Sequence, residues 1–374
     1  MFGTVLIVAC TVMQLYVTWR AASVPAVVRC LGRRGVVLAS AVLWALLVAA
    51  RLVAHGGEGA LAVTLELVGM DWMAALFLTC VALLAVDLVT VFGLLLPRLA
   101  PRLRGWALAA GGALTAIAVV QGMRAPVVNA YEVRLRDLPA ALDGTVLVAV
   151  SDLHAGSLLG ERWLAARVAQ VQAERPDLIV LLGDLLEGHG GEEGGLAPVL
   201  RRLTAPLGVW AVTGNHESHR RPDATPGAVA AAGLAVLHDR WVELRPGLIV
   251  AGVDDLTSRR SGEGAEMIAR ALAGRPAGAV VLLSHTPWYA DTAAADGASL
   301  MLGGHTHGGQ IWPFGYLVRT VYPLLAGRYE VAGMPVIVCR GTGTWGPRMR
   351  LWPPGEILRI TLRSGPAPAA SAPG

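Results

Sequence analysis

Five short polar segments between residues 152 and 307 carry the side chains that could do chemistry. Each follows an apolar run directly, and together they offer carboxylate, imidazole and amide groups but no thiolate. Such a mixed nitrogen and oxygen set suits manganese, iron or zinc. The segments therefore predict a site for two divalent metal ions. The candidate metal ligands are Asp152, His154, Asp184, Asn215, His285, His305 and His307.

The spacing of these residues indicates what the metals would do. His305 and His307 stand two apart, and alternation along an extended segment would place both on one side, with Thr306 pointing away. Asp184 stands alone after a glycine, which makes it the natural bridge between two ions. Paired metals about 3.5–4 Å apart clamp a phosphate and activate water. His216 follows Asn215 and would lie beside the substrate, to stabilise the transition state or protonate the leaving oxygen.

Each motif by itself has a plainer explanation. Asp-x-His is frequent by chance and is usually structural, Gly-Asp after a strand is ordinarily a turn, and a lone His285 is more often a core histidine. Only the Gly-His-Thr-His segment favours a metal without support from the others. The five motifs in order favour a metal-dependent phosphoester hydrolase. A non-catalytic membrane sensor or scaffold is the alternative, but a degenerate domain should have lost ligands and none is missing.

The apolar runs before these residues must position them, and their length and composition predict short strands. Helical spacing is predicted for 161–174, and the mixture favours an α/β fold with at least one mixed sheet. Loops at the carboxyl ends of strands converge at one sheet edge, where α/β proteins build their sites. The predicted strands are 144–151, 178–182, 209–212, 248–253, 280–283, 300–302, 328–331, 335–340 and 356–362.

The first third of the chain predicts a membrane region. The chain is 54% hydrophobic and only 16% charged, against about 25% charged residues in soluble domains. Four apolar stretches, at 3–19, 35–54, 72–96 and 106–122, approach the roughly 20 residues that cross a bilayer. We expect a transmembrane helical region at 1–123, a linker at 124–143, the catalytic domain at 144–363 and a disordered tail at 364–374.

Arginines beside these stretches predict the orientation. Short arginine-rich loops stay in the cytoplasm, and the loop between the second and third stretches is acidic instead. The catalytic domain of this multi-pass membrane protein would then lie outside the cytoplasm. The arginines are Arg20, Arg29, Arg33 and Arg34 in the first loop and Arg98, Arg102 and Arg104 in the third.

Asp87 lies midway along the third apolar stretch. An ionisable group at that depth is costly and is a functional candidate. No second charge within the stretches is evident to pair with it. A protonated carboxyl that is hydrogen-bonded inside the bundle is therefore favoured over a functional role.

The small excess of basic residues does not indicate that the chain binds nucleic acid. The formal net charge is +4, every basic residue is arginine, and no run of arginines exceeds two. No basic stripe is interleaved with aromatic residues. The cysteines form no CxxC pair, which disfavours a zinc ribbon. We expect a phosphoester substrate and a membrane as partners, and no nucleic acid.

The pattern D-x-H, G-D, G-N-H-[DE], H, G-H-x-H resembles the calcineurin-like metallophosphoesterases. The segments 303–310 and 339–347 resemble the bacterial membrane-associated branch more narrowly, and the similarity covers residues 140–363. The resemblance implies a four-layered αββα sandwich with a two-metal centre. One metal would take Asp152, His154, Asp184 and His307, the other Asp184, Asn215, His285 and His305, with His216 as the catalytic imidazole.

One position departs from the family pattern. Members often carry an aspartate three residues after the Gly-Asp carboxylate, where this chain has Glu187, so the role of that side chain is open. Members include hydrolases of UDP-2,3-diacylglucosamine and of other phosphodiesters. The substrate is therefore open among a phosphodiester, a phosphomonoester and a pyrophosphate, and the membrane anchor favours a lipid or envelope substrate.

Overall fold

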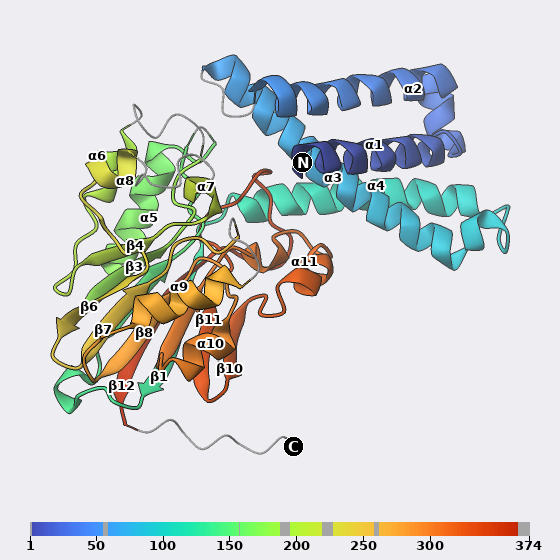
Figure 1. The fold of residues 1–374 in the computed structure, drawn as a ribbon. Coiled ribbons are helices and arrows are strands. Elements are labelled where there is room, and N and C mark those ends of the chain that lie inside the picture. The colour runs from blue at the N-terminus through green and yellow to red at the C-terminus, as the bar shows by residue number, and fades with distance from the viewer. Residues whose placement is uncertain are drawn as a thin grey trace. The chain divides into compact units, whose positions relative to one another are not determined.

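The computed structural model describes residues 2–54, 59–156, 158–187, 195–218, 227–257 and 262–365. These residues form two units (Figure 1). The helical unit comprises residues 1–124 together with 346–352, and the catalytic unit comprises 125–345 and 353–374. Most of the predicted disordered tail lies outside the described residues. The predicted domain boundaries stay a prediction.

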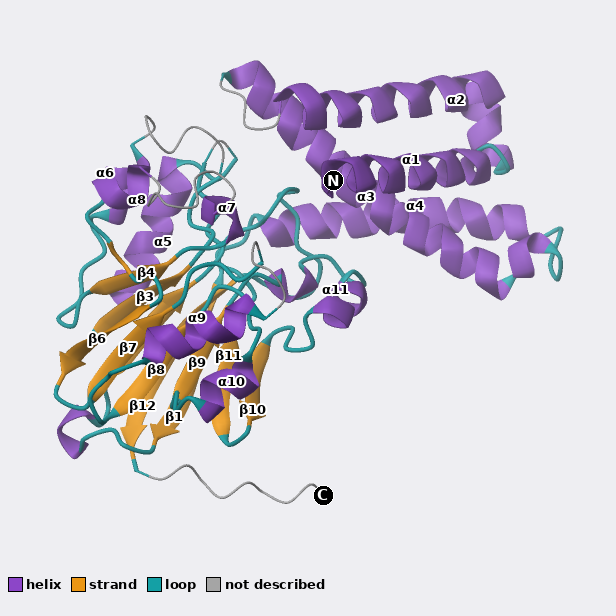
Figure 2. Cartoon of the chain, in the orientation of Figure 1, coloured by secondary structure: helices purple, strands orange, loops and turns teal. Residues whose placement is uncertain are grey.

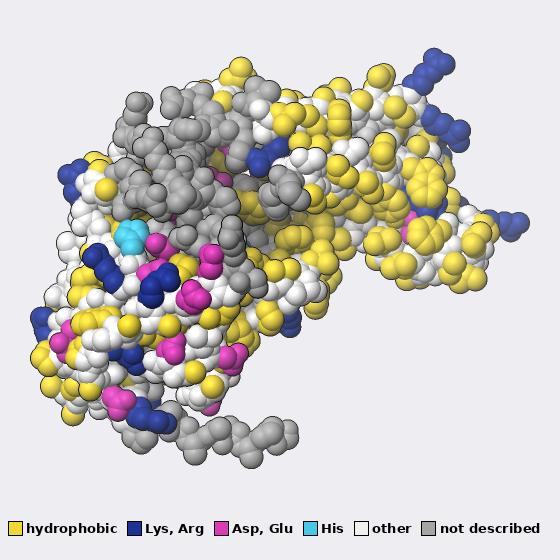
Figure 3. Space-filling view, in the orientation of Figure 1, with side chains coloured by type: hydrophobic (Ala, Val, Ile, Leu, Met, Phe, Trp, Pro, Cys, Tyr) yellow, Lys and Arg dark blue, Asp and Glu magenta, His cyan; other side chains and the backbone are white. Residues whose placement is uncertain are grey.

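Among the described residues, four helices are long and apolar enough to cross a membrane. They are coloured purple at one end of the chain in Figure 2, and their exposed apolar side chains are the yellow surface over these helices in Figure 3. The second, third and fourth begin upstream of their predicted starts at 35, 72 and 106, because polar residues such as Arg29 and Glu66 lie within the helices. The four helices are α1 (Phe2–Ala21), α2 (Pro25–Ala49), α3 (Ala60–Val89) and α4 (Ala100–Gly122).

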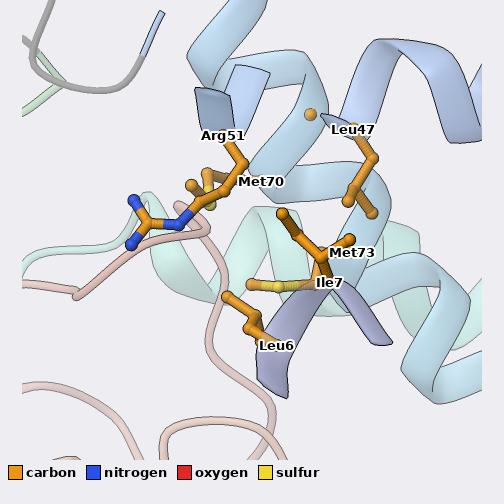
Figure 4. Close-up of a pocket in the computed structure, with 7 residues that line it drawn as sticks. Leu6, Ile7, Leu47, Arg51, Met70 and Met73 are labelled. Carbon is orange, nitrogen blue, oxygen red and sulfur yellow. The ribbon is translucent and has the colours of Figure 1, made fainter. Parts of the chain in front are cut away.

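Small residues let these helices approach closely. A Cβ atom added to Gly69 of α3 would lie 2.2 Å from the Cβ of Ala50, which follows α2. Contacts of this kind are typical of membrane helices, where packing replaces the hydrophobic effect. A small pocket remains nearby, and Figure 4 shows Arg51 extending away from its apolar lining. The lining residues are Leu6, Ile7, Leu47, Arg51, Gly69, Met70 and Met73.

The expectation that no charge pairs with Asp87 is wrong. Asp87 is fully buried, and its Oδ2 lies 2.5 Å from Nε of Arg20 and accepts a hydrogen bond from the Tyr16 hydroxyl at 2.7 Å. Nε of Arg104 donates to Oδ1 at 3.0 Å. Both arginines sit at helix ends and are buried, although the sequence places them beside loops. Asp87 is therefore ion-paired, and it ties α1, α3 and α4 together.

The segment 346–352 belongs to the helical unit although it comes late in the sequence. Its amides bind the helices: Arg348 N donates to Asp71 Oδ1 at 3.0 Å, and Arg350 N donates to the Ala118 carbonyl at 2.9 Å. Trp352 N donates to Gln121 Oε1 at 2.8 Å. The sequence analysis included this segment in the catalytic domain. Its attachment to α3 and α4 is made by backbone amides, which leave no signal in the sequence of the segment.

The described strands of the catalytic unit form two six-stranded sheets, with orders β1-β12-β2-β3-β4-β5 and β10-β11-β9-β8-β7-β6. Strands β2, β3 and β4 are parallel neighbours, as are β7, β8 and β9, while β12–β2 and β10–β11 are antiparallel. The sheets are therefore mixed, as predicted. Their strands are β1 (Val127–Leu135), β2 (Val146–Val150), β3 (Leu178–Leu182), β4 (Val209–Val212), β5 (Ala235–Val236), β6 (Arg240–Arg245), β7 (Leu248–Gly252), β8 (Ala279–Leu283), β9 (Leu300–Gly303), β10 (Gly327–Val331), β11 (Met334–Val338) and β12 (Glu356–Ser364).

Three apolar layers hold the catalytic unit together. One lies between the sheets and joins residues such as Leu147 and Leu283. Another packs the outer face of the first sheet on Leu164 and its helical neighbours, and the third packs the second sheet on Ile268. This is a four-layered αββα sandwich. The covering helices are α5 (Glu161–Ala173), α6 (Leu196–Leu200) and α8 (Gly227–Ala231) on one side, and α9 (Glu263–Leu272) and α10 (Ala290–Ala295) on the other.

The segment expected as a linker contains a strand. Residues Val127–Leu135 form β1, which pairs in parallel with β12 at the sheet edge. Only two of its residues are buried, so it lacks the continuous apolar run by which the other strands were recognised. Its partner lies more than 220 residues later, which is why local sequence does not reveal the pairing.

Candidate metal centre

The seven predicted ligands lie just beyond the carboxyl ends of five strands. Strands β2, β3 and β4 of the first sheet and β8 and β9 of the second end at this place. Asn215 opens the short helix α7 (Asn215–Ser218), which follows β4. The centre is thus built where parallel strands of both sheets end, as the position of the motifs predicts.

One group of donors surrounds Asp152. Nε2 of His307 lies 3.3 Å from Asp152 Oδ1 and 3.2 Å from Nε2 of His154. Asp152 Oδ2 accepts hydrogen bonds from Ser151 Oγ at 2.5 Å and from the His305 amide at 3.0 Å. One carboxylate oxygen is thereby held by the protein, and the other faces the two imidazoles.

A second group surrounds His285. Its Nε2 lies 3.2 Å from Asp184 Oδ2, 3.2 Å from Asn215 Oδ1 and 3.1 Å from Nδ1 of His305. Its Nδ1 lies 2.8 Å from the Leu182 carbonyl, a bond that orients the ring. Asp184 Oδ2 is also 3.8 Å from Nε2 of His154 in the first group. Asp184 therefore lies between the two groups, in the position of a bridging ligand.

The donors fit a pair of divalent ions. Among the described residues there are three sets of side chains, and within each set the ligand atoms lie within 4.8 Å of one another. Ligands bound at about 2.0–2.2 Å are themselves about 3.0–3.6 Å apart, which matches the separations above. Within the described part of the chain, buried Asp152 Oδ1 has no hydrogen-bond donor. A buried carboxylate oxygen facing imidazoles is a natural cation ligand.

The backbone of the ligands is strained. Asp152, His154, Asp184, His305 and His307 all have φ between 45° and 69°, in the left-handed region. Each such residue costs about 1–2 kcal/mol, and such strain collects at functional sites. Backbone hydrogen bonds from the amides of Asp152 and His154 to Gly183 and Asp184 hold the turns.

The predicted extended form of the Gly-His-Thr-His segment is wrong. His305 is left-handed, Thr306 is helical, and His307 begins a short 3₁₀ turn. The turn sends His305 to the group around His285 and His307 to the group around Asp152. A Cβ on Gly304 would lie 1.8 Å from Ser151 Oγ, so a glycine is required for this turn to approach β2.

The carboxylates and imidazoles of the centre shift one another's pKa values. Burial disfavours charged His154, but Glu187 and the two aspartates outweigh it and raise its pKa to about 9. Burial also disfavours charged His285, but the nearby carboxylates, mainly Asp184, outweigh it and raise the pKa of His285 to about 10. Burial and charged His285 lower the pKa of His305 to about 4. A metal ligand must be a neutral imidazole, so metal binding competes with the protonation that the carboxylates favour at His154 and His285.

His216 lies at the edge of the centre. Its side chain is 24% exposed, and its Nε2 is 4.0 Å from Asp184 Oδ2. Its ring stands edge-on to His154, with centroids 4.8 Å apart. Burial lowers its pKa below the usual histidine value. The imidazole is near both groups of donors yet still reaches solvent, as a residue that meets substrate should.

The structure also places Glu187 at the centre. Its carboxylate lies 3.4 Å from Nδ1 of His154 and 4.0 Å from Nδ1 of His216. These three residues form the third set of neighbouring ligand atoms. The longer arm of glutamate at this position thus still reaches the site, and it orients His154.

Sequence reasoning gave two further side chains at the site, Tyr322 and Glu217, no role at the metals. Tyr322, whose hydroxyl lies 2.8 Å from Nε2 of His305, belongs to no motif. Glu217 belongs to one but had no assigned role. It is buried and accepts hydrogen bonds from the amides of Asp184, Leu185, Leu186 and Gly214, at 2.8–3.3 Å. Burial and Asp184 raise the pKa of Glu217, while the amides oppose that rise. Glu217 therefore fixes the loop that presents Asp184.

Replacing Glu217 with glutamine is expected to destabilise the protein and slow any hydrolysis. Each carboxylate oxygen accepts hydrogen bonds from two backbone amides. Glutamine would replace one of these oxygens with an NH₂ group, which cannot accept, so two backbone N–H groups would lose their acceptor. Each unsatisfied group costs about 1–3 kcal/mol. Thermal unfolding of the detergent-solubilised chain measures the loss. Glu330→Gln, at an exposed position of β10, is the matched control. Identical melting curves for both variants would refute this role.

The glycine-rich segment 341–345 is hydrogen-bonded to the segments that carry the ligands. The Gly343 amide donates to the Asp152 carbonyl at 2.9 Å, and the Thr342 amide donates to the Ser151 carbonyl at 2.8 Å. Trp345 exchanges two hydrogen bonds with Gln310, both 3.0 Å long. The segment therefore holds the Asp152 loop and the Gly-His-Thr-His turn in place.

Comparison with known proteins agrees with this geometry. The model of the calcineurin-like phosphoesterases matches residues 145–309. An uncharacterized metallophosphoesterase of Aquifex aeolicus is 32% identical over 243 residues, which are 63% of this chain and 91% of that protein. The chain belongs to the calcineurin-like phosphoesterase family. It therefore carries a metal-dependent phosphoester hydrolase domain, of a family that uses two metal ions.

Other relatives share the membrane character. A Danio rerio protein named a transmembrane protein with metallophosphoesterase domain is 31% identical over 268 residues, 67% of this chain and 61% of that protein. Together with the four apolar helices, this indicates a membrane protein. Among solved structures, a dimetal phosphatase from Danio rerio aligns with a TM-score of 0.32 and 15% identity, over 54% of this chain and 88% of that one.

Proposed function

We propose that this chain is a membrane-anchored two-metal phosphoesterase that acts on a phosphodiester, phosphomonoester or pyrophosphate at a lipid or envelope surface. The supporting observation is the meeting of seven metal-binding side chains and His216 at the strand ends of both sheets. Two divalent ions, when bound, would polarise the phosphoryl group and activate the attacking water. Manganese, iron and zinc all suit the donors.

The protein side chains have distinct roles in this proposal. Asp152, His154 and His307 hold one ion, Asn215, His285 and His305 hold the other, and Asp184 contributes to both. His216 projects at the edge of this arrangement and acts on the phosphoryl or leaving oxygen. Glu187 and Tyr322 orient His154 and His305, through the nitrogen that faces away from the neighbouring ligands.

Hydrolysis of bis-p-nitrophenyl phosphate by the full chain in detergent, with added manganese, tests the proposal. We expect His216→Ala to lower kcat about 10²–10⁴-fold, the usual range for a positioned acid or base. His238→Ala is the control, since His238 pairs with Asp254 outside the metal groups. Equal, negligible rates for wild type and His216→Ala, with two metals bound, would contradict the enzymatic function.

The leaving group distinguishes the two roles of His216. p-Nitrophenolate departs without a proton, whereas the alkoxide of glycerol phosphate needs one. If His216 protonates the leaving oxygen, the loss in His216→Ala is larger for glycerol phosphate than for p-nitrophenyl phosphate. An equal loss assigns His216 to the phosphoryl oxygens.

We further propose that the catalytic domain lies outside the cytoplasm. Arg20 and Arg104 are buried against Asp87. The asymmetry is kept by Arg29, Arg33 and Arg34 in the N-terminal part of α2 and by Arg98 and Arg102 beside the start of α4. Protease added to cells stripped of any outer barrier should digest the catalytic domain, whereas inverted vesicles should protect it. The opposite pattern would overturn the orientation.

A further inference from the structure

One segment of the catalytic unit exposes an unusual amount of apolar surface. Among the described residues of this unit, the exposed large apolar side chains are Val127 and five that cluster within 312–321. We call residues 312–321 the apolar segment. The exposed fractions are 43% for Trp312, 45% for Phe314, 69% for Tyr316, 61% for Leu317 and 57% for Val321.

The apolar segment is attached to the metal centre at both ends. It begins five residues after His307, and its helix α11 (Gly315–Val321), which has no buried residue, ends directly before Tyr322. The Tyr322 hydroxyl contacts His305, and its ring stacks on Trp288 with centroids 5.2 Å apart. Thr306 donates to the Leu325 carbonyl at 2.5 Å. The segment is thus a loop with a short helix. Its two ends are fixed to the metal centre, and its apolar side chains are exposed.

The charge of this region suits an anionic lipid surface. Residues 308–329 contain Arg319 and Arg328 but no aspartate or glutamate. Tryptophan and tyrosine favour the membrane interface, and apolar side chains combined with basic ones are typical of segments that lie in it. A protein partner is less well matched, because the segment offers no acidic group and its largest exposed side chains are apolar or aromatic.

The connections between the helical unit and the catalytic unit are short. Helix α4 ends at Gly122 and β1 begins at Val127, and residues 123–126 span at most about 14 Å when extended. The segment 346–352, which belongs to the helical unit, ties the catalytic unit to the helices at two further points. Connections of this length limit how far the catalytic unit can move from the helices.

We infer that the apolar segment inserts its side chains into the lipid bilayer that the chain's own helices span. This inference rests on the proposed membrane location and is independent of the hydrolytic activity. Insertion would hold the metal centre at the level of the lipid headgroups, because Tyr322 and Thr306 connect the segment to the Gly-His-Thr-His turn.

Site-specific fluorescence on the full chain tests the inference. The four native cysteines are replaced, and Leu317→Cys is labelled with an environment-sensitive fluorophore in nanodiscs of phosphatidylcholine with a minority of phosphatidylglycerol. We expect loss of fluorescence with nitroxide-bearing acyl chains and protection from aqueous iodide. Glu330→Cys, exposed on β10 of the same unit, should show the reverse. Tyr316→Cys is a second labelled position, should the first disturb folding.

Two outcomes would overturn the inference. Quenching of the Leu317 label by iodide alone would leave the segment in water. Protection from both quenchers would mean that protein covers it, either this chain's helices or a second copy. Neither readout depends on catalysis. A failure of bis-p-nitrophenyl phosphate hydrolysis would therefore count against the proposed function and leave lipid insertion separately measured.

Discussion

Asp184→Asn should abolish hydrolysis, with a loss of at least about 10³-fold in kcat/KM, and should lower the metal content of the purified chain. Asparagine tolerates the left-handed backbone of this position, and its oxygen can still accept the His216 amide that now donates to Asp184 Oδ1 at 2.9 Å. The oxygen that faces His154 and His285 becomes an NH₂ group, which cannot bind a cation. A metal contributes several kcal/mol of charge stabilisation, equivalent to the stated loss.

The control for this variant is Asp291→Asn, which makes the same chemical change at an exposed position in the first turn of α10. Metal content by elemental analysis and hydrolysis of bis-p-nitrophenyl phosphate are measured on both proteins. If Asp184→Asn retained two equivalents of metal and wild-type activity, Asp184 would not be a shared ligand. A loss of activity with full metal content would restrict Asp184 to a different role at the site.

Asp87→Asn is expected to lower the stability of the helical unit by about 3–5 kcal/mol, the usual cost of removing one partner from a buried ion pair. The carboxylate is fully buried and lies within 3.0 Å of both Arg20 and Arg104. Asparagine preserves the shape but leaves two buried guanidinium groups without their anion. Thermal unfolding of the full chain in detergent should show the loss as a lower melting temperature.

A double-mutant cycle separates the ion pair from general damage. Arg104→Gln alone should also destabilise the unit, and the double variant Asp87→Asn with Arg104→Gln should lose less than the sum of the two. Strict additivity would show that the two side chains do not interact, and an unchanged melting temperature in Asp87→Asn would refute a stabilising role for the carboxylate. Hydrolysis of a soluble substrate distinguishes damage to the helices from damage to the catalytic unit.

Much of the catalytic fold could be predicted because its central strands carry local signals. Strands such as β3 and β4 are short apolar runs, and the observed bounds match the expected ones residue for residue. Strand β1 could not be recognised in this way. It lies at a sheet edge with mostly exposed side chains, and its partner β12 is remote in the chain.

The residue types of the site were predictable, whereas their conformations were not. An extended Gly-His-Thr-His segment would present His305 and His307 to one side, but the left-handed turn divides them between the two groups of donors. The role of Glu217 also depends on four amides from two separate loops. Hydrogen bonds between distant segments leave no periodicity in the sequence to show them.

The sequence by itself indicated the membrane character, the α/β class and the candidate metal ligands, because hydropathy and strand-end motifs are local properties. Only the tertiary structure decided which side chains face one another. It placed Asp184 between both groups of donors, gave Asp87 two arginine partners and left the apolar segment 312–321 exposed. Those outcomes depend on how remote elements pack, and packing arises from contacts that the order of residues along the chain does not display.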